Sequence, residues 1–147
     1  WGSAYLNRDF FARIGESMAD DVLLVMGEAD GRWVCGALHF IGRDALYGRN
    51  WGCAGDFAFL HFETCYYRAM DFAIERGLPT VEAGAQGTHK IQRGYMPTPT
   101  YSAHYIPDEG FRAAVARFLD EERRVVAREM AALAEYAPFR RDAGDAA

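Results

Sequence analysis

The residues best suited to catalysis fall in one glycine-rich segment, EAGAQGTHKIQRGY, which begins at Glu82 and ends at Tyr95. Glu82 or His89 can accept a proton from an attacking amine, directly or through water. Tyr95 can donate a proton to a leaving group. Taken singly, each residue fits a twisted surface loop equally well. Several polar groups that converge on one loop, however, favour a site over a solvated surface.

The same segment carries groups that suit an anionic substrate. Its glycines let backbone N–H groups approach an anion or a polarised carbonyl closely. Lys90 and Arg93 can hold a phosphate or a carboxylate, the arginine through a bidentate fork. We therefore expect Gln86, Lys90 and Arg93 to bind substrate, together with Arg49 from an earlier strand.

Two further histidines are predicted to contact substrate. His61 opens the middle helix, as a cap or as a site residue, and His104 alternates with Tyr105 in the last predicted strand. His61 and Glu63 point about 200° apart on a helix, so they do not chelate one metal together. No Cys/His spacing matches a zinc site, and no metal is expected. A metal-dependent hydrolase that uses His61, Glu63, His89 and His104 is therefore the least favoured alternative.

The elements that must position these groups are read from apolar spacing and turn residues. Residues 7–19, 61–76 and 107–136 are predicted helices, and residues 22–26, 32–41, 45–52, 80–83 and 101–106 are predicted strands. The first three strands should form an antiparallel meander. The middle helix should then cross over one face of the sheet. The unbroken apolar run 22–26 suits a strand that is covered on both faces, and His39 is expected to be half-buried with its hydrogen bonds satisfied.

Length and charge narrow the class of protein. The chain has 147 residues, which suggests one domain over 1–139 and a flexible tail over 140–147. A formal charge of −5 argues against a general binder of nucleic acid or of anionic membranes. No apolar run is long enough to span a membrane, and no leader is visible. Cys35, Cys53 and Cys65 are expected to be reduced, buried thiols of a cytoplasmic protein.

Four stretches of the chain together resemble the FemAB-like branch of the GNAT acyltransferase superfamily, often labelled peptidoglycan biosynthesis or recognition proteins. They are the hairpin EADGRWVCGAL (28–38), the strand LYGRNWG (46–52), the helix HFETCYY (61–67) and the loop 84–95. The strings HFETCYY, EAGAQGTHK and RGYMPTPTYSAH look specific to one bacterial subfamily. The resemblance implies an α+β fold with a mixed, largely antiparallel sheet, flanking helices and a long C-terminal helix. It also implies a splay between the strands 47–52 and 80–83.

The resemblance implies that an acyl or aminoacyl group is transferred to an amine, with a cell-wall precursor as acceptor. The donor would be aminoacyl-tRNA, or acetyl-CoA or another acyl-CoA. The chain resembles the C-terminal half of such enzymes, so a similar half would precede it. Two departures stand out. Residues 49–54 match Arg-x-x-Gly-x-Ala, the pattern with which GNAT enzymes bind the coenzyme A pyrophosphate, but the match begins inside a predicted strand and not at a strand-to-helix junction. In the loop, Gln92 stands where the family has a lysine. The alternative is a non-catalytic module that recognises peptidoglycan or peptide, or a structural half-domain.

Overall fold

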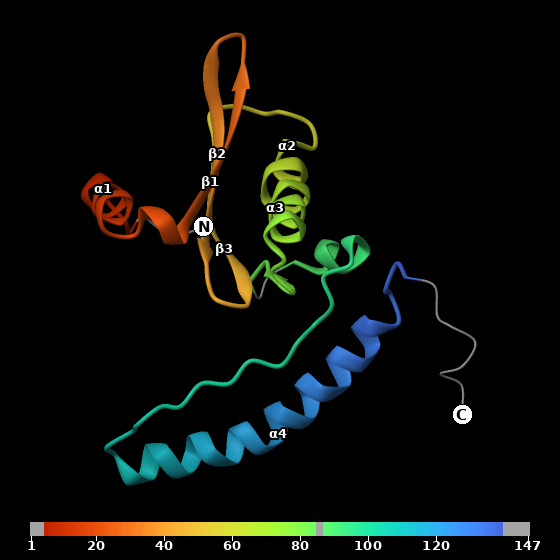
Figure 1. Cartoon of the computed structure of the whole chain (residues 1–147). Helices are drawn as coiled ribbons and strands as arrows, with labels where there is room; N and C mark the ends of the chain where they lie inside the picture. The colour runs from red at the N-terminus through yellow and green to blue at the C-terminus, as the bar shows by residue number, and fades with distance from the viewer. Residues whose placement is uncertain (1–4, 85–86, 140–147) are drawn as a thin grey trace. The chain divides into compact units, whose positions relative to one another are not determined.

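The computed structural model of the chain describes residues 5–84 and 87–139. These residues form two compact units, one within 1–85 and the other within 86–147 (Figure 1). Each unit is described by itself below. The expectation of a single domain over 1–139 stays a prediction, and the tail 140–147 lies outside the described residues.

The first unit is built on a four-stranded sheet whose strands lie in the order β1-β2-β3-β4. The strands are β1 (Val22–Ala29), β2 (Arg32–Ile41), β3 (Ala45–Cys53) and β4 (Thr80–Glu82). The first three pair antiparallel, and β4 pairs parallel with β3. Asp30 and Gly31 form the first turn with φ values of 51° and 74°, as a two-residue hairpin requires. The predicted meander and the α+β class are confirmed.

Helices flank this sheet. Helix α1 (Arg8–Ser17) begins at Asn7, whose side chain accepts a hydrogen bond from the Phe10 N–H at 2.9 Å. A short 3-10 turn, η1 (Ala19–Asp21), leads into β1. The middle helix runs through α2 (Leu60–Phe62), a π-helical turn η2 (Glu63–Tyr67) and α3 (Arg68–Arg76), and ends at Gly77 with φ 67°. Figure 1 shows α1 and α3 on opposite faces of the sheet.

The core of this unit contains the buried side chains of β2, β3 and the middle helix. Its most buried members are Leu46 and Ala69, each 0% exposed, Ala37 at 1% and His39 at 2%. The expectation that 22–26 is covered on both faces is wrong, because Leu24 is 56% exposed and Met26 41% exposed. β1 stands at the edge of the sheet. An apolar run alone does not reveal how many faces of a strand are covered.

The cysteine expectation needs a correction as well. All three cysteines are free, but only Cys35 is buried; Cys65 is half-buried and Cys53 is exposed. Cys53 is the last residue of β3, where the strand passes into the loop before α2. An apolar neighbourhood in sequence does not bury a residue at the end of a strand.

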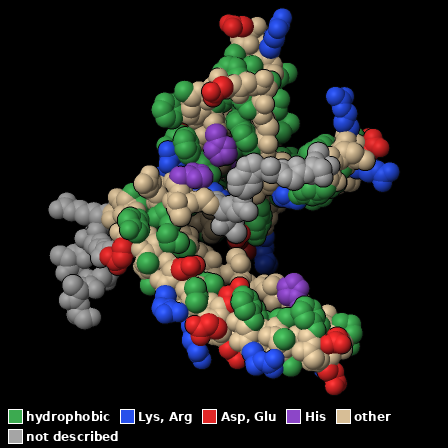
Figure 2. Space-filling view, turned by 180° about the vertical axis from the view of Figure 1, so that it is seen from behind, with side chains coloured by type: hydrophobic (Ala, Val, Ile, Leu, Met, Phe, Trp, Pro, Cys, Tyr) green, Lys and Arg blue, Asp and Glu red, His purple; other side chains and the backbone are tan. Residues whose placement is uncertain are grey.

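The second unit consists of a 3-10 helix η3 (Thr88–Arg93), an extended segment and the long helix α4 (Glu109–Ala134). The Asp108 carboxylate accepts a hydrogen bond from the Phe111 N–H at 2.7 Å and caps α4. Acidic and basic side chains are interspersed along α4 (Figure 2), in pairs such as Arg123 with Asp120 at 3.1 Å. Such exposed pairs suit a solvated helix surface.

The strand predicted over 101–106 is wrong. These residues are extended but belong to no strand, and Tyr101 and Tyr105 are 91% and 85% exposed. Alternation of polar and apolar residues favours extended backbone, but a strand also needs a neighbour with which to pair. Among the described residues, no helix combines the length and the apolar character needed to cross a membrane.

Candidate active site at the end of strand β4

The ladder between β3 and β4 is short. Its three residue pairs are Ala45 with Thr80, Leu46 with Val81 and Tyr47 with Glu82, whereas β3 itself continues to Cys53. After Glu82 the chain leaves the strand and turns at Gly84, where φ is +75°. Glu82, the predicted base, is therefore the last residue of β4, exposed at the point where the two parallel strands stop pairing.

Gly48 sits at this same point. A Cβ atom added there would lie 3.3 Å from the Glu82 carbonyl oxygen and 3.8 Å from Cδ2 of His39. Contacts of 3.3 Å are tight for a Cβ atom, so a larger residue would press on the end of β4. The absence of a side chain at 48 lets the chain after β4 and the His39 ring approach β3 closely.

Strand β3 carries a β-bulge at Arg49. Leu38 of β2 is opposite Asn50, and His39 is opposite Gly48, so Arg49 is the extra residue. A bulge increases the local twist and redirects the side chains around it. The guanidinium of Arg49 donates to the Tyr5 hydroxyl at 2.5 Å and lies 5.8 Å from the centre of that ring. This cation is therefore held by the segment that precedes α1.

Two buried polar atoms lie beside the bulge on the two paired strands. Within the described chain, Nδ1 of His39 and Oδ1 of Asn50 have no hydrogen-bond partner. The expectation of a half-buried His39 is wrong, because the residue is 2% exposed, and the expectation that its hydrogen bonds are satisfied is wrong at Nδ1. Burial lowers the pKa of His39, which favours the neutral imidazole. Unpaired buried polar atoms are costly, and each one calls for an explanation, of which a role in a site is one.

His61 belongs to an aromatic cluster on the middle helix. Its Nε2 lies 3.4 Å from the Tyr66 hydroxyl, and its Nδ1 lies 3.8 Å from Sγ of Cys65. Its ring meets the Trp51 ring edge-on at 5.2 Å between centres. The π-helical turn aligns residues five apart, and this brings His61 and Tyr66 together. π-Turns occur frequently at functional sites.

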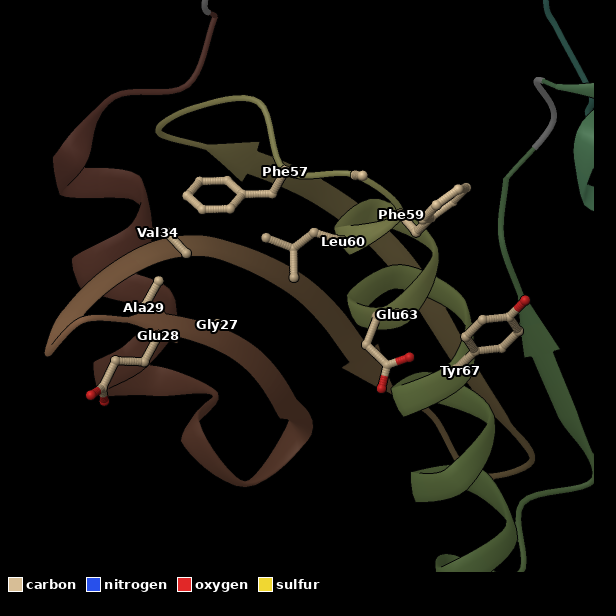
Figure 3. A pocket seen from close by; sticks show the side chains of 10 residues that line it. Gly27, Glu28, Ala29, Val34, Phe57, Phe59, Leu60, Glu63 and Tyr67 are labelled. Atoms are coloured by element: carbon tan, nitrogen blue, oxygen red, sulfur yellow. The ribbon is translucent and has the colours of Figure 1, made fainter.

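A cavity of about 410 Å³ opens near the end of the β1–β2 hairpin. Figure 3 shows the side chains of Phe57, Leu60 and Glu63 around it. The Glu63 carboxylate accepts hydrogen bonds from Nε and Nη2 of Arg68 at 2.8 and 2.6 Å. Phe59, in the wall, has φ 64°, an uncommon value for a residue other than glycine. Sequence reasoning missed this cavity, because three separate segments of the chain supply its walls.

The cavity is lined mainly by apolar groups, with the Glu63 carboxylate and the ring of Tyr67 at one side. Its full lining is Gly27, Glu28, Ala29, Val34, Phe57, Ala58, Phe59, Leu60, Glu63 and Tyr67. An apolar pocket of this size with few polar groups is typical of sites for small molecules or side chains.

The second unit holds two of the three predicted cations, Lys90 and Arg93. On a 3-10 helix, residues three apart eclipse one another, so Lys90 and Arg93 of η3 lie on one side. Burial lowers the pKa of Lys90. Arg93 donates from Nη1 to the His89 carbonyl oxygen at 3.0 Å. The His89 ring lies against Gly87, whose φ is +99°. This side of η3 can therefore present two cations to one anion.

The expected site residues thus fall into two groups. Arg49, His61 and Glu82 lie in the first unit, whereas His89, Lys90, Arg93, Tyr95 and His104 lie in the second. Nε2 of exposed His104 is 2.9 Å from Oγ of Ser102. Gln86 lies outside the described residues. The expectation that Glu82 acts together with His89 and Tyr95 spans both units and stays a prediction. In the part of the chain that the structure describes, no three His, Cys, Asp or Glu side chains could hold one metal ion.

These features define an α+β protein whose candidate site combines a β-bulge in β3 with the end of the short parallel strand β4. The chain belongs to the FemAB-like family, described as peptidoglycan biosynthesis/recognition, whose model matches residues 1–141. No curated protein and no solved structure matches the chain.

Proposed function

We propose that the chain is an acyltransferase or aminoacyltransferase module that moves an acyl group to an amine, with a cell-wall precursor as the acceptor. The observation that carries the proposal is the end of the β3–β4 ladder at Tyr47 and Glu82, beside the bulge at Arg49. Strand β3 continues beyond the last residue that pairs with β4. The backbone N–H and C=O groups on that edge of β3 can therefore bind an extended donor. Membership of a peptidoglycan-related family supports the class of acceptor.

In the proposed reaction the acceptor amine attacks the acyl carbonyl carbon of a thioester or an ester. An N–C bond forms, the C–S or C–O bond breaks, and the leaving thiol or hydroxyl takes a proton. Glu82 is the first candidate for the base that accepts the amine proton, with His89 as the alternative. Tyr95 is the candidate donor to the leaving group. Positioning of the two substrates and stabilisation of the oxyanion would supply most of the rate.

Lys90 and Arg93 are the proposed contacts to the anionic part of the donor, together with Arg49. Their support is the shared side of η3, since two adjacent cations match a phosphate better than one does. Arg49 is already held by Tyr5, which would fix its orientation before a donor arrives. Gln86, His61 and His104 are proposed substrate contacts.

The alternative is a non-catalytic module that recognises a peptide or a peptidoglycan fragment. The cavity beside Glu63 favours it, because a mainly apolar lining that also includes Glu28 and Glu63 suits an apolar side chain that carries an amino group. A recognition module would bind muropeptide without any acyl donor, and it would release no coenzyme A or tRNA.

The direct test offers the protein acetyl-CoA, a longer acyl-CoA or aminoacyl-tRNA, each with a muropeptide that has a free amine. Transfer is detected as the mass added to the acceptor, and binding is detected by the thermal shift of the protein. We expect one donor to stabilise the protein and to acylate the muropeptide. If muropeptide alone stabilises it and no donor reacts, the recognition alternative replaces the transferase proposal.

Substitutions then test the assigned roles. Glu82→Gln should lower kcat by about a hundredfold or more if it is the base, and an intact kcat would move that role to His89, tested by His89→Asn. Lys90→Ala with Arg93→Ala should weaken donor binding by about tenfold or more. The matched control removes two exposed cations from α4, with Arg123→Ala and Arg128→Ala. Equal donor affinity in the two double variants would remove the anion site from the proposal.

A further inference from the structure

Cys35 of β2 and Cys53 of β3 lie directly opposite each other in the antiparallel ladder. The next pair outward, Val34 and Ala54, is hydrogen-bonded, because the Ala54 N–H donates to the Val34 carbonyl at 2.8 Å. Hydrogen-bonded and non-hydrogen-bonded pairs alternate along such a ladder. Cys35 and Cys53 therefore form a non-hydrogen-bonded pair, the arrangement in which opposite side chains stand closest.

Non-hydrogen-bonded partners have Cα atoms about 4.5 Å apart. Disulfides form between Cα atoms about 4.4–6.8 Å apart. The backbone of this pair thus already lies within the range of a disulfide, and no strand has to move. Both side chains project from the same face of the sheet, since direct partners in a ladder share a face.

The two sulfur atoms have separate neighbours in the reduced protein. Sγ of Cys53 donates to the Gly55 carbonyl oxygen at 3.1 Å. Sγ of Cys35 lies over Gly27, where a Cβ atom would meet it at 2.5 Å. Closing a bond between them requires rotation of the two side chains about χ1. The same rotation would free the Gly55 carbonyl at the start of the loop that leads into α2.

The third cysteine differs from this pair in its environment. Cys65 is half-buried on the middle helix, with Sγ 3.8 Å from Nδ1 of His61. Burial, and after it the charge of the nearby Cys35, raise its pKa to about 11, so it is almost entirely protonated at neutral pH and a poor nucleophile. Cys53 is exposed, so an oxidant in solution reaches it directly, and Cys35 then stands opposite it as the resolving thiol.

We propose that Cys35 and Cys53 form a reversible cross-strand disulfide when the protein meets a disulfide oxidant. The Cys53 thiolate attacks one sulfur of the oxidant and expels the first thiol, which leaves a mixed disulfide. The Cys35 thiolate then attacks Sγ of Cys53 and expels the second thiol. The two protein thiols lose two electrons and two protons, and the oxidant disulfide is reduced to two thiols.

The bond would fasten the end of β3 at the entrance of the loop 54–59. That loop supplies Phe57 and Phe59 to the cavity wall and leads to α2, which carries His61. Oxidation would therefore act on the loop without touching the residues proposed for catalysis.

The test uses glutathione disulfide as the oxidant, followed by alkylation of the remaining thiols and intact mass measurement. We expect two of the three cysteines to become unreactive with no glutathione retained, and dithiothreitol to restore both. Cys65→Ser should lose its remaining two thiols in the same way. Cys53→Ser should form no internal bond, and Cys35→Ser should retain one glutathione on Cys53.

Peptide mapping identifies the linked pair. Trypsin alone leaves Cys53 and Cys65 in one peptide, between Arg49 and Arg68, so a second cut before Asp56 is needed to separate them. A link between the peptides that contain Cys35 and Cys53 supports the proposal. A link from Cys35 to Cys65, glutathione that stays on Cys53 of the unaltered chain, or a link between two chains would overturn it. Because Cys35 is buried, circular dichroism of Cys35→Ser and of Cys35→Ala checks that each variant folds.

Discussion

Nε2 of His61 lies 3.4 Å from the hydroxyl oxygen of Tyr66, five residues further along the chain. In an α-helix, residues five apart point in different directions, whereas the π-helical turn Glu63–Tyr67 aligns them. The Glu63 carboxylate and the Arg68 guanidinium are joined across the same spacing, at 2.6 Å. The wider turn thus places the Tyr66 hydroxyl beside His61, and it pairs the Glu63 carboxylate at the cavity with Arg68.

Tyr66→Phe should destabilise the protein by about 1 kcal/mol, because it removes a buried hydroxyl that interacts with His61. Tyr67→Phe is the matched control, since Tyr67 is 42% exposed, and it should change the free energy of unfolding by less than about 0.5 kcal/mol. Urea unfolding of both variants measures the difference. Equal stability of the two would mean that the hydroxyl of Tyr66 contributes nothing to the fold.

Gly48→Ala should cost about 1 kcal/mol of folding free energy, because its Cβ atom would press on the Glu82 carbonyl at 3.3 Å. Gly52 lies on the same strand with nothing within 4 Å of an added Cβ atom. Gly52→Ala should therefore leave stability unchanged or raise it by up to about 1 kcal/mol. Urea midpoints compare the two. If both substitutions change the free energy of unfolding equally, the close approach of β4 to Gly48 does not limit the size of the residue at position 48.

Acid should destabilise the protein partly through His39. Burial lowers its folded-state pKa below the ordinary 6.5, so the unfolded chain takes up a proton that the folded chain resists. The contribution of neutral His39 to the free energy of unfolding is complete above pH 6.5. It is lost as the pH falls from there toward the lower pKa of the folded state. His39→Leu should remove this loss, so its unfolding free energy falls less than that of the wild type between about pH 8 and 5.

His104→Gln is the control for the acid experiment, because His104 is exposed. Its unfolding free energy should follow the wild-type pH dependence closely. Parallel curves for the wild type and His39→Leu would show that protonation of His39 is not coupled to folding.

The oxidised protein should be more stable than the reduced one. A disulfide between Cys35 and Cys53 would constrain the unfolded chain over the hairpin that joins them, with a gain of up to about 3 kcal/mol. Urea unfolding with and without dithiothreitol measures the gain, and Cys53→Ser should show none. A less stable oxidised protein would indicate that the bond strains the ends of β2 and β3.

The meander and the helices were predictable because their signals are local. Asp30-Gly31 favours a two-residue hairpin wherever it occurs between two strands, and Asn7 and Asp108 cap helices through bonds to residues three positions later. Each of these features depends on a few adjacent residues. The predicted ends of such elements therefore agree with the structure to within a few residues.

The candidate site was less predictable because it depends on pairing between distant segments. The bulge at Arg49 appears only when β3 is aligned with β2, and the unpaired Nδ1 of His39 follows from its burial opposite Gly48. The π-helical turn replaces what the periodicity indicated as a regular helix. The strand expected over 101–106 failed for the same reason, since residue types do not say whether a partner strand is present.

The parallel strand β4 also has a consequence for the order of folding. The pairing of Thr80 with Ala45 joins segments that the whole middle helix separates in sequence, whereas the antiparallel hairpins join segments that are neighbours in sequence. Contacts of long sequence separation pay a larger entropy of loop closure and slow folding. We therefore expect the hairpins to assemble first and β4 to dock late, so that the end of β4 becomes competent for ligand only in the final step of folding.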